Sequence, residues 1–145
     1  MQLEHFIEHL DKIRQSQRGF DYKLGEGVQL GDFVDVEESL NIRIPDQIKS
    51  FYLIANGLKT IHPDFKLIEI DLWEVDLGLI HFATFDKSIK VNFNTKELNE
   101  AGEWTVLTDA TNYEVTLTIS SFWSNKIWHW IKHNRPIWAD RWWID

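Results

Sequence analysis

The chain contains no cysteine, and its 145 residues include only three prolines, seven glycines and one methionine. The absence of cysteine excludes disulfides and thiolate metal sites, which is consistent with a reducing compartment. No run approaches the roughly 20 apolar residues of a membrane-spanning helix. The first residues also lack the basic start and apolar run of a secretion signal. We therefore expect a cytoplasmic protein.

Hydrophobic residues make up 43% of the chain and charged residues 26%, the balance of an ordinary soluble domain. Composition does not shift along the sequence, so we expect a single domain over residues 1–145. The formal net charge is −8. Such a chain repels nucleic-acid phosphates and anionic membranes and attracts a basic partner. The alternative is that the acidic residues serve solubility alone.

Apolar residues recur at helical spacing in three stretches of the first half of the chain. They predict helices over about residues 2–17, 32–40 and 45–55. The third helix starts at Pro45, whose fixed φ suits a first helical turn. We expect Asn56 and Gly57 to end it in the left-handed conformation. The four glycines of residues 19–31 predict a loop.

After Leu67 the chain changes to alternating or wholly apolar stretches, which are typical of strands. The predicted strands are residues 67–73, 79–85, 89–93, 104–108 and 113–119. The short connection 86–88 predicts an antiparallel hairpin. A final helix ends at Pro136, and the apolar tail 137–145 is expected to pack on the core. The whole order predicts an α+β fold, a largely antiparallel sheet of about five to six strands with helices on one face and at the ends.

The stretch from Glu37 to Gly57 combines a glutamate, a leucine, a proline, an aromatic residue and an Asn-Gly pair. The residues of this motif are Glu37, Leu40, Pro45, Phe51, Asn56 and Gly57. The pattern resembles the SUKH superfamily, which shows E-x-x-L-G-x-x-L-P, a short helix and then Asn-Gly. Asn41 stands where the family usually has glycine, and Ile44 where it has leucine. Later elements extend the resemblance over most of residues 33–131.

The resemblance implies a protein that binds other proteins and is not an enzyme. Most bacterial members are immunity proteins that bind and block a cognate toxin domain, whereas fungal members regulate cell-wall synthesis and signalling. The family has no common catalytic residues, and we interpret the six motif residues as structural. We expect no catalytic, cofactor or metal site, and a basic, nuclease-type toxin domain as the partner. A regulatory scaffold protein and a carbohydrate-binding module are the alternatives, and monomer and dimer both stay open.

The densest acidic cluster of the chain is the candidate surface for that partner. Its residues are Glu69, Asp71, Trp73, Glu74 and Asp76. In a strand over residues 67–73, Glu69 and Asp71 would share a face with Trp73. Carboxylates around an exposed ring suit a basic partner, because the charges steer the encounter and the ring anchors the contact. The alternative is a solubilising face with Trp73 covered by a neighbour.

Two histidine pairs raise the question of a metal site. His5 and His9, like His129 and His133, are spaced i, i+4 on predicted helices, which is how helical zinc sites begin. A site needs a third ligand, and no H-E-x-x-H motif accompanies either pair. We therefore expect no bound metal.

Eight tryptophans are present, and six of them lie after residue 120. Sugar-binding modules expose such rings as stacking platforms, which keeps carbohydrate binding open. Trp123 and Trp130 are spaced i, i+7 on the predicted helix, and that spacing is typical of a core.

Overall fold

The computed structural model describes residues 5–109 and 113–135. The helical elements are α1 (Phe6–Ser16), α2 (Leu30–Leu40), α3 (Asp46–Ile54), the 3₁₀ helix η2 (Ile70–Leu72), α4 (Ile119–Ser121), the π-helical segment η3 (Phe122–Ile127) and α5 (Trp128–His133). The strands are β1 (Asp21–Glu26), β2 (Ala55–Ile61), β3 (Phe65–Leu67), β4 (Val75–Asp76), β5 (Leu79–Phe85), β6 (Ile89–Asn94), β7 (Thr105–Thr108) and β8 (Tyr113–Thr116).

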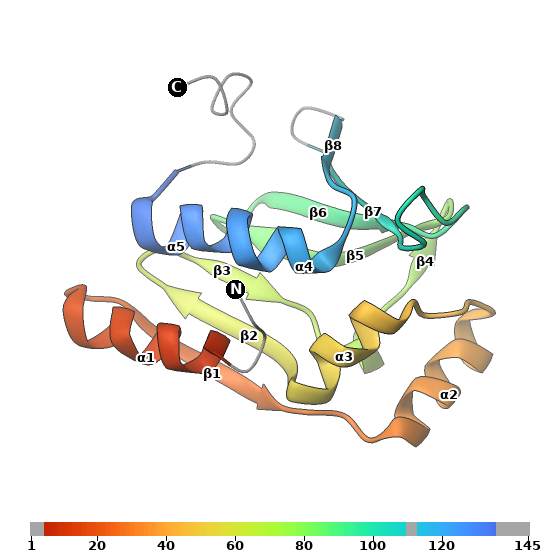
Figure 1. Cartoon of the computed structure of the whole chain (residues 1–145), viewed down its shortest axis with the longest axis horizontal. Helices are drawn as coiled ribbons and strands as arrows, with labels where there is room; N and C mark the ends of the chain where they lie inside the picture. The colour runs from red at the N-terminus through yellow and green to blue at the C-terminus, as the bar shows by residue number, and fades with distance from the viewer. Residues whose placement is uncertain (1–4, 110–112, 136–145) are drawn as a thin grey trace.

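All strand pairs in the described part of the chain are antiparallel, in the order β1-β2-β3-β5-β6-β7-β8, and β4 pairs with β5. Figure 1 shows α1, α3 and the continuous α4–η3–α5 segment over one face of the sheet, with α2 beyond its end. The predicted α+β fold is confirmed, and so is the β5–β6 hairpin. The sheet has eight strands, more than the five to six expected. No helix in the described residues is long and apolar enough to cross a membrane.

Strand β1 lies in the glycine-rich stretch that we expected to be a loop, so that prediction is wrong. It pairs along β2, and Gly25 inside it and Gly27 after it allow close approach to the backbones of β2 and α3. A Cβ on Gly25 would lie 2.2 Å from the carbonyl oxygen of Asn56, and one on Gly27 would lie 1.8 Å from that of Leu53. Glycine is therefore required here for close packing inside and beside a strand.

Helix α3 runs into β2 without a loop, because its C-cap Ala55 is already the first strand residue. Asn56 and Gly57, which we expected to end the helix, are therefore strand residues. The Asn56 side chain accepts a hydrogen bond from the Ile70 backbone N–H at 2.9 Å, and Gly57 has a φ of +102°. At the other end, Pro45 is the N-cap and Asp46 is the first helical residue, so the helix starts one position later than predicted.

Residues 67–73 do not form the predicted strand, because β3 ends at Leu67 and residues 70–72 form η2. Side chains three residues apart lie on the same side of a 3₁₀ helix. Ile70 and Trp73 therefore both face the core, and Trp73 is only 4% exposed. The Trp73 ring makes edge contacts with Tyr52 and Phe93.

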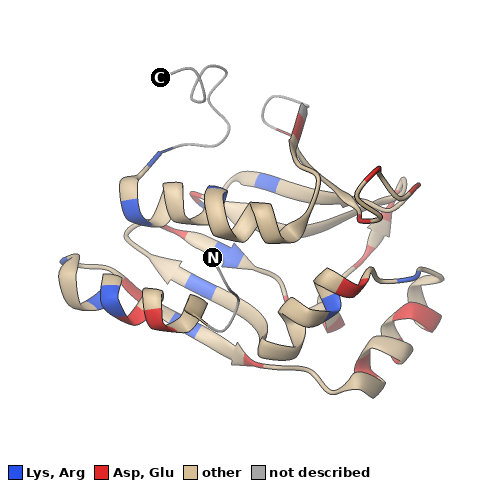
Figure 2. Cartoon of the chain, viewed as in Figure 1, with Lys and Arg blue, Asp and Glu red and all other residues tan. Residues whose placement is uncertain are grey.

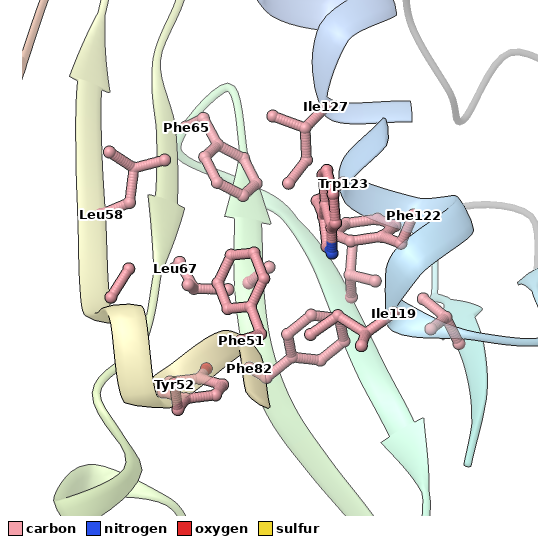
Figure 3. Packing of buried hydrophobic residues seen from close by; sticks show 14 of the residues in the cluster. Phe51, Tyr52, Leu58, Phe65, Leu67, Phe82, Ile119, Phe122, Trp123 and Ile127 are labelled. Atoms are coloured by element: carbon pink, nitrogen blue, oxygen red, sulfur yellow. The ribbon is translucent and has the colours of Figure 1, made fainter. Parts of the chain in front are cut away.

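The core between the sheet and the helices is rich in aromatic rings (Figure 3). Phe82 on β5 and Phe93 on β6 stack with ring centroids 3.7 Å apart. Phe122 from the C-terminal helical segment meets Phe82 edge-on at 5.4 Å. The apolar positions predicted for that segment are all buried, namely Phe122, Trp123, Ile127, Trp130 and Ile131. The predicted packing of the tail 137–145 lies outside the described residues.

Candidate functional site

The first motif residue, Glu37, makes contacts that hold the fold. Its carboxylate accepts a hydrogen bond from the Ile44 backbone N–H at 2.7 Å and lies 3.5 Å from Lys49 Nζ. Both contacts tie α2 to α3 and to the segment between them. The neighbouring motif residues are buried or partly buried, namely Leu40, Pro45 and Phe51. We therefore keep the interpretation of the motif as structural.

The five candidate docking residues differ in their exposure. Asp71, Glu74 and Asp76 are open to solvent, and Glu69 is half-buried. Trp73 lies in the core, so the expectation of an exposed ring among the carboxylates is wrong. Within residues 5–109 and 113–135, the three exposed acids take part in no ion pair. Their negative charge is therefore available to a partner.

Apolar side chains are also exposed beside these acids, namely Val75 and two leucines. Leu72 is 60% exposed and Leu77 is 83% exposed. We refer to the segment 71–77, which carries the three exposed acids and these leucines, as the acidic loop. Alternation over residues 67–73 placed Leu72 on the same face as Ile70, and no periodic pattern marks Leu77, which is why sequence reasoning missed both.

Leu77 also has an unfavourable backbone conformation. It forms the β4–β5 turn together with Gly78, and both residues have positive φ values, 52° and 77°. A two-residue hairpin turn of this kind favours Asn-Gly, because asparagine tolerates the left-handed region and leucine does not. Leu77 therefore costs the fold backbone strain, and no burial of its side chain offsets that cost.

A hollow of about 400 Å³ lies beside the acidic loop, and residues of both charges line it. Glu74 and Asp76 lie on one side, and Lys90 from β6 lies on the other. Between them, the His81 ring shares a hydrogen bond with Thr84 Oγ1 at 2.9 Å. Burial, and then the nearby Lys90 cation, hold the pKa of His81 below its usual value. His81 is therefore neutral at pH 7, and the charge of this hollow comes from the carboxylates and the lysine.

A second hollow, of about 630 Å³, lies between the segment before α3 and the β6–β7 connection. Glu103 lines it and is only 6% exposed. Among the described residues, its Oε1 atom has no hydrogen-bond partner. Burial raises the pKa of Glu103, and the Asp46 charge adds to the shift, whereas the Gln47 backbone N–H opposes it. A buried carboxyl oxygen with no described hydrogen-bond partner is unusual in a folded protein.

The histidine pairs lie in different surroundings. His5 is exposed, and the His9 ring packs edge-on against Trp128 at 5.8 Å. The rings of His129 and His133 lie 6.3 Å apart. In the part of the chain that the structure describes, no group of three or more potential ligands is placed to hold a metal ion.

The tryptophans of the described residues are all buried. They are Trp73, Trp104, Trp123, Trp128 and Trp130. None of these rings is available as a stacking platform for a sugar. The remaining three, Trp138, Trp142 and Trp143, lie outside the described residues.

No protein-family model matches the chain, and no curated protein matches its sequence. The proposals for function therefore depend on the geometry above and on the resemblance of the Glu37–Gly57 motif.

Proposed function

We propose that this chain is a non-enzymatic protein-binding module of the SUKH immunity type, which binds a basic toxin domain and covers its active site. The motif resemblance supports the class of protein. The acidic loop supports the site, because it joins two exposed leucines to three carboxylates that form no ion pair within the described residues. The carboxylates would steer a basic partner into encounter, and the leucines would anchor it once docked.

Leu77 is the observation that carries this proposal. Its side chain is 83% exposed, and its φ of 52° disfavours leucine. Strain at an exposed position points to a role outside folding. A partner pocket that buries Leu77 would recover about 1.5–3 kcal/mol from the apolar surface.

The experiment is a capture from lysate of the native organism, with elution at low and then at high salt and identification of the eluate by mass. The wild-type protein should retain a basic protein with a toxin-like domain and release it at high salt, because exposed charges are screened by salt. The variant Leu77→Asn should lose most of that capture. The captured toxin domain should also lose its activity on addition of one equivalent of the wild-type protein.

The matched control is Leu98→Asn, which changes a leucine that is 60% exposed and lies outside the acidic loop. It should capture the partner as the wild type does. Equal capture by the wild type and Leu77→Asn would remove the acidic loop from the proposal. Capture of a cell-wall or signalling protein in place of a toxin would favour a regulatory scaffold.

A further inference from the structure

Four lysines lie in line across the face of the sheet that points away from α1, α3 and the α4–α5 segment. They are Lys23 on β1, Lys59 on β2, Lys66 on β3 and Lys90 on β6, and all four are exposed. We refer to these four residues as the lysine row. Figure 2 shows blue segments on neighbouring strands of the sheet.

The strand register places these side chains directly opposite one another. Lys23 faces Lys59 across the β1–β2 pair, and Lys59 faces Lys66 across β2–β3. Thr84 on β5 continues the line, opposite Lys66 on one side and Lys90 on the other. Because directly opposed residues share one face of a sheet, the four ammonium groups project to the same side.

No carboxylate among the described residues forms a direct ion pair with this row. None of the four lysines takes part in an ion pair within residues 5–109 and 113–135. Like charges directly opposite each other destabilise a sheet. The row therefore costs the free protein stability, although the chain has acids in excess, with a net charge of −8.

The size and surroundings of the row limit what it can bind. Neighbouring strands lie about 4.8 Å apart, so the row spans about 20 Å from β1 to β6. Acids border it at Asp64, at Asp109 beside Lys90, and at Glu74 and Asp76 of the acidic loop. A long polyanion such as nucleic acid would have to cross these acids and approach a chain of negative net charge. A short segment with several carboxylates can contact the lysines and stop short of these acids.

We propose that the lysine row binds an acidic segment of a protein partner, which presents its carboxylates over about 20 Å. The site goes beyond the proposed function, because the acidic loop takes a basic surface and the lysine row takes an acidic one, and the two adjoin at the hollow that Glu74, Asp76 and Lys90 line. Binding would replace the repulsion between opposed lysines by ion pairs, and this supplies the stability that the free sheet lacks.

The test uses fluorescein-labelled decaglutamate as the probe, with fluorescence anisotropy at low and high salt. The wild-type chain should bind it, and binding should weaken as salt is added. The double variant Lys59→Gln/Lys66→Gln should bind about tenfold more weakly, because it loses two exposed ion pairs. The same variant should unfold at a higher temperature than the wild type, because it loses an opposed pair of like charges. A row with a purely structural role would give a lower unfolding temperature.

The matched control is Lys12→Gln/Lys132→Gln, which removes the same charge from two exposed lysines on α1 and α5. It should bind decaglutamate as the wild type does. Equal weakening by both double variants would show that only net charge matters and would overturn the site. Preference for an oligothymidylate of equal charge would assign the face to nucleic acid instead. Preference for phosphatidylserine vesicles would assign it to a membrane surface. Absence of decaglutamate binding would overturn the proposal outright.

Discussion

The two faces of the sheet differ in whether their side chains are packed or paired with other residues of the chain. On the covered face, Phe82 and Phe93 stack within a continuous aromatic core. On the uncovered face, Lys59 and Lys66 oppose each other without a described counter-ion. Packing on the covered face therefore stabilises the folded state, whereas the opposed lysines on the uncovered face destabilise it. A residue's effect on stability should depend on which face it occupies, even within one strand.

The largest effect should come from truncation of a ring on the covered face. Phe82→Ala should lower the free energy of unfolding by about 3–5 kcal/mol, because it removes a fully buried ring and leaves a cavity. Asn92 lies on β6 and on the uncovered face of the sheet. Asn92→Ala should change the free energy of unfolding by no more than about 0.5 kcal/mol. Urea denaturation of both variants measures the difference. A similar loss in both would contradict the contrast between the faces.

An intermediate effect should come from loss of a carboxylate that forms a hydrogen bond and an ion pair within the chain. Glu37→Ala should lower the free energy of unfolding by about 1–3 kcal/mol, because it leaves the Ile44 N–H without its acceptor and Lys49 without its carboxylate. The neighbouring Glu38→Ala is the control, since Glu38 is exposed. Both variants are measured by thermal or urea unfolding. Equal stabilities would show that the Glu37 contacts do not hold α2 in place.

The smallest effect concerns Glu103, the buried acid whose Oε1 atom has no described partner. Its pKa is raised by burial, so the folded state holds the proton more tightly than the unfolded state does. That contribution to stability is complete below the unfolded pKa of about 4.3 and is lost as pH rises through the folded pKa. Glu103→Gln should therefore stabilise the protein by about 1 kcal/mol at pH 7 and by less at pH 4.

The measurement for Glu103 is a series of urea unfolding curves between pH 4 and pH 8 for the wild type and the variant. Glu97→Gln is the matched control, because Glu97 is exposed and lines the same hollow. Its unfolding curves should follow those of the wild type over the whole series. A difference for Glu103→Gln that is constant with pH would show that its carboxyl group is not the cause.

Hydrophobic periodicity correctly predicted those elements whose own residues repeat at helical or strand spacing. The β5–β6 hairpin and the buried positions of the C-terminal helix followed from alternation and helical spacing. Strand β1 could not be predicted in this way. Glycine is needed at position 25 because the Asn56 backbone lies close to it, and that contact exists only in the tertiary structure. Alternation over residues 67–73 favoured a strand, whereas the structure uses the three-residue spacing of Ile70 and Trp73 in a 3₁₀ helix. The prediction therefore placed Trp73 on the wrong side.

The candidate surface was predicted only in part, for a related reason. Acid density located Asp71, Glu74 and Asp76 correctly on the surface, because charged side chains are exposed in almost any fold. It could not show that Leu72 and Leu77 are exposed whereas Trp73 is buried. The lysine row was invisible in sequence, because Lys23, Lys59 and Lys66 become neighbours only through strand register.

The absence of a loop between α3 and β2 has a mechanical consequence. A hinge needs residues whose φ and ψ can change without breaking hydrogen bonds, and Ala55 belongs to the helix cap and the strand at once. The end of the helix and the start of the strand should therefore open together, as one cooperative unit. Amide hydrogen exchange at Tyr52 and at Leu58 should then proceed through the same opening event. A force applied to β2 from the uncovered face would reach α3 directly.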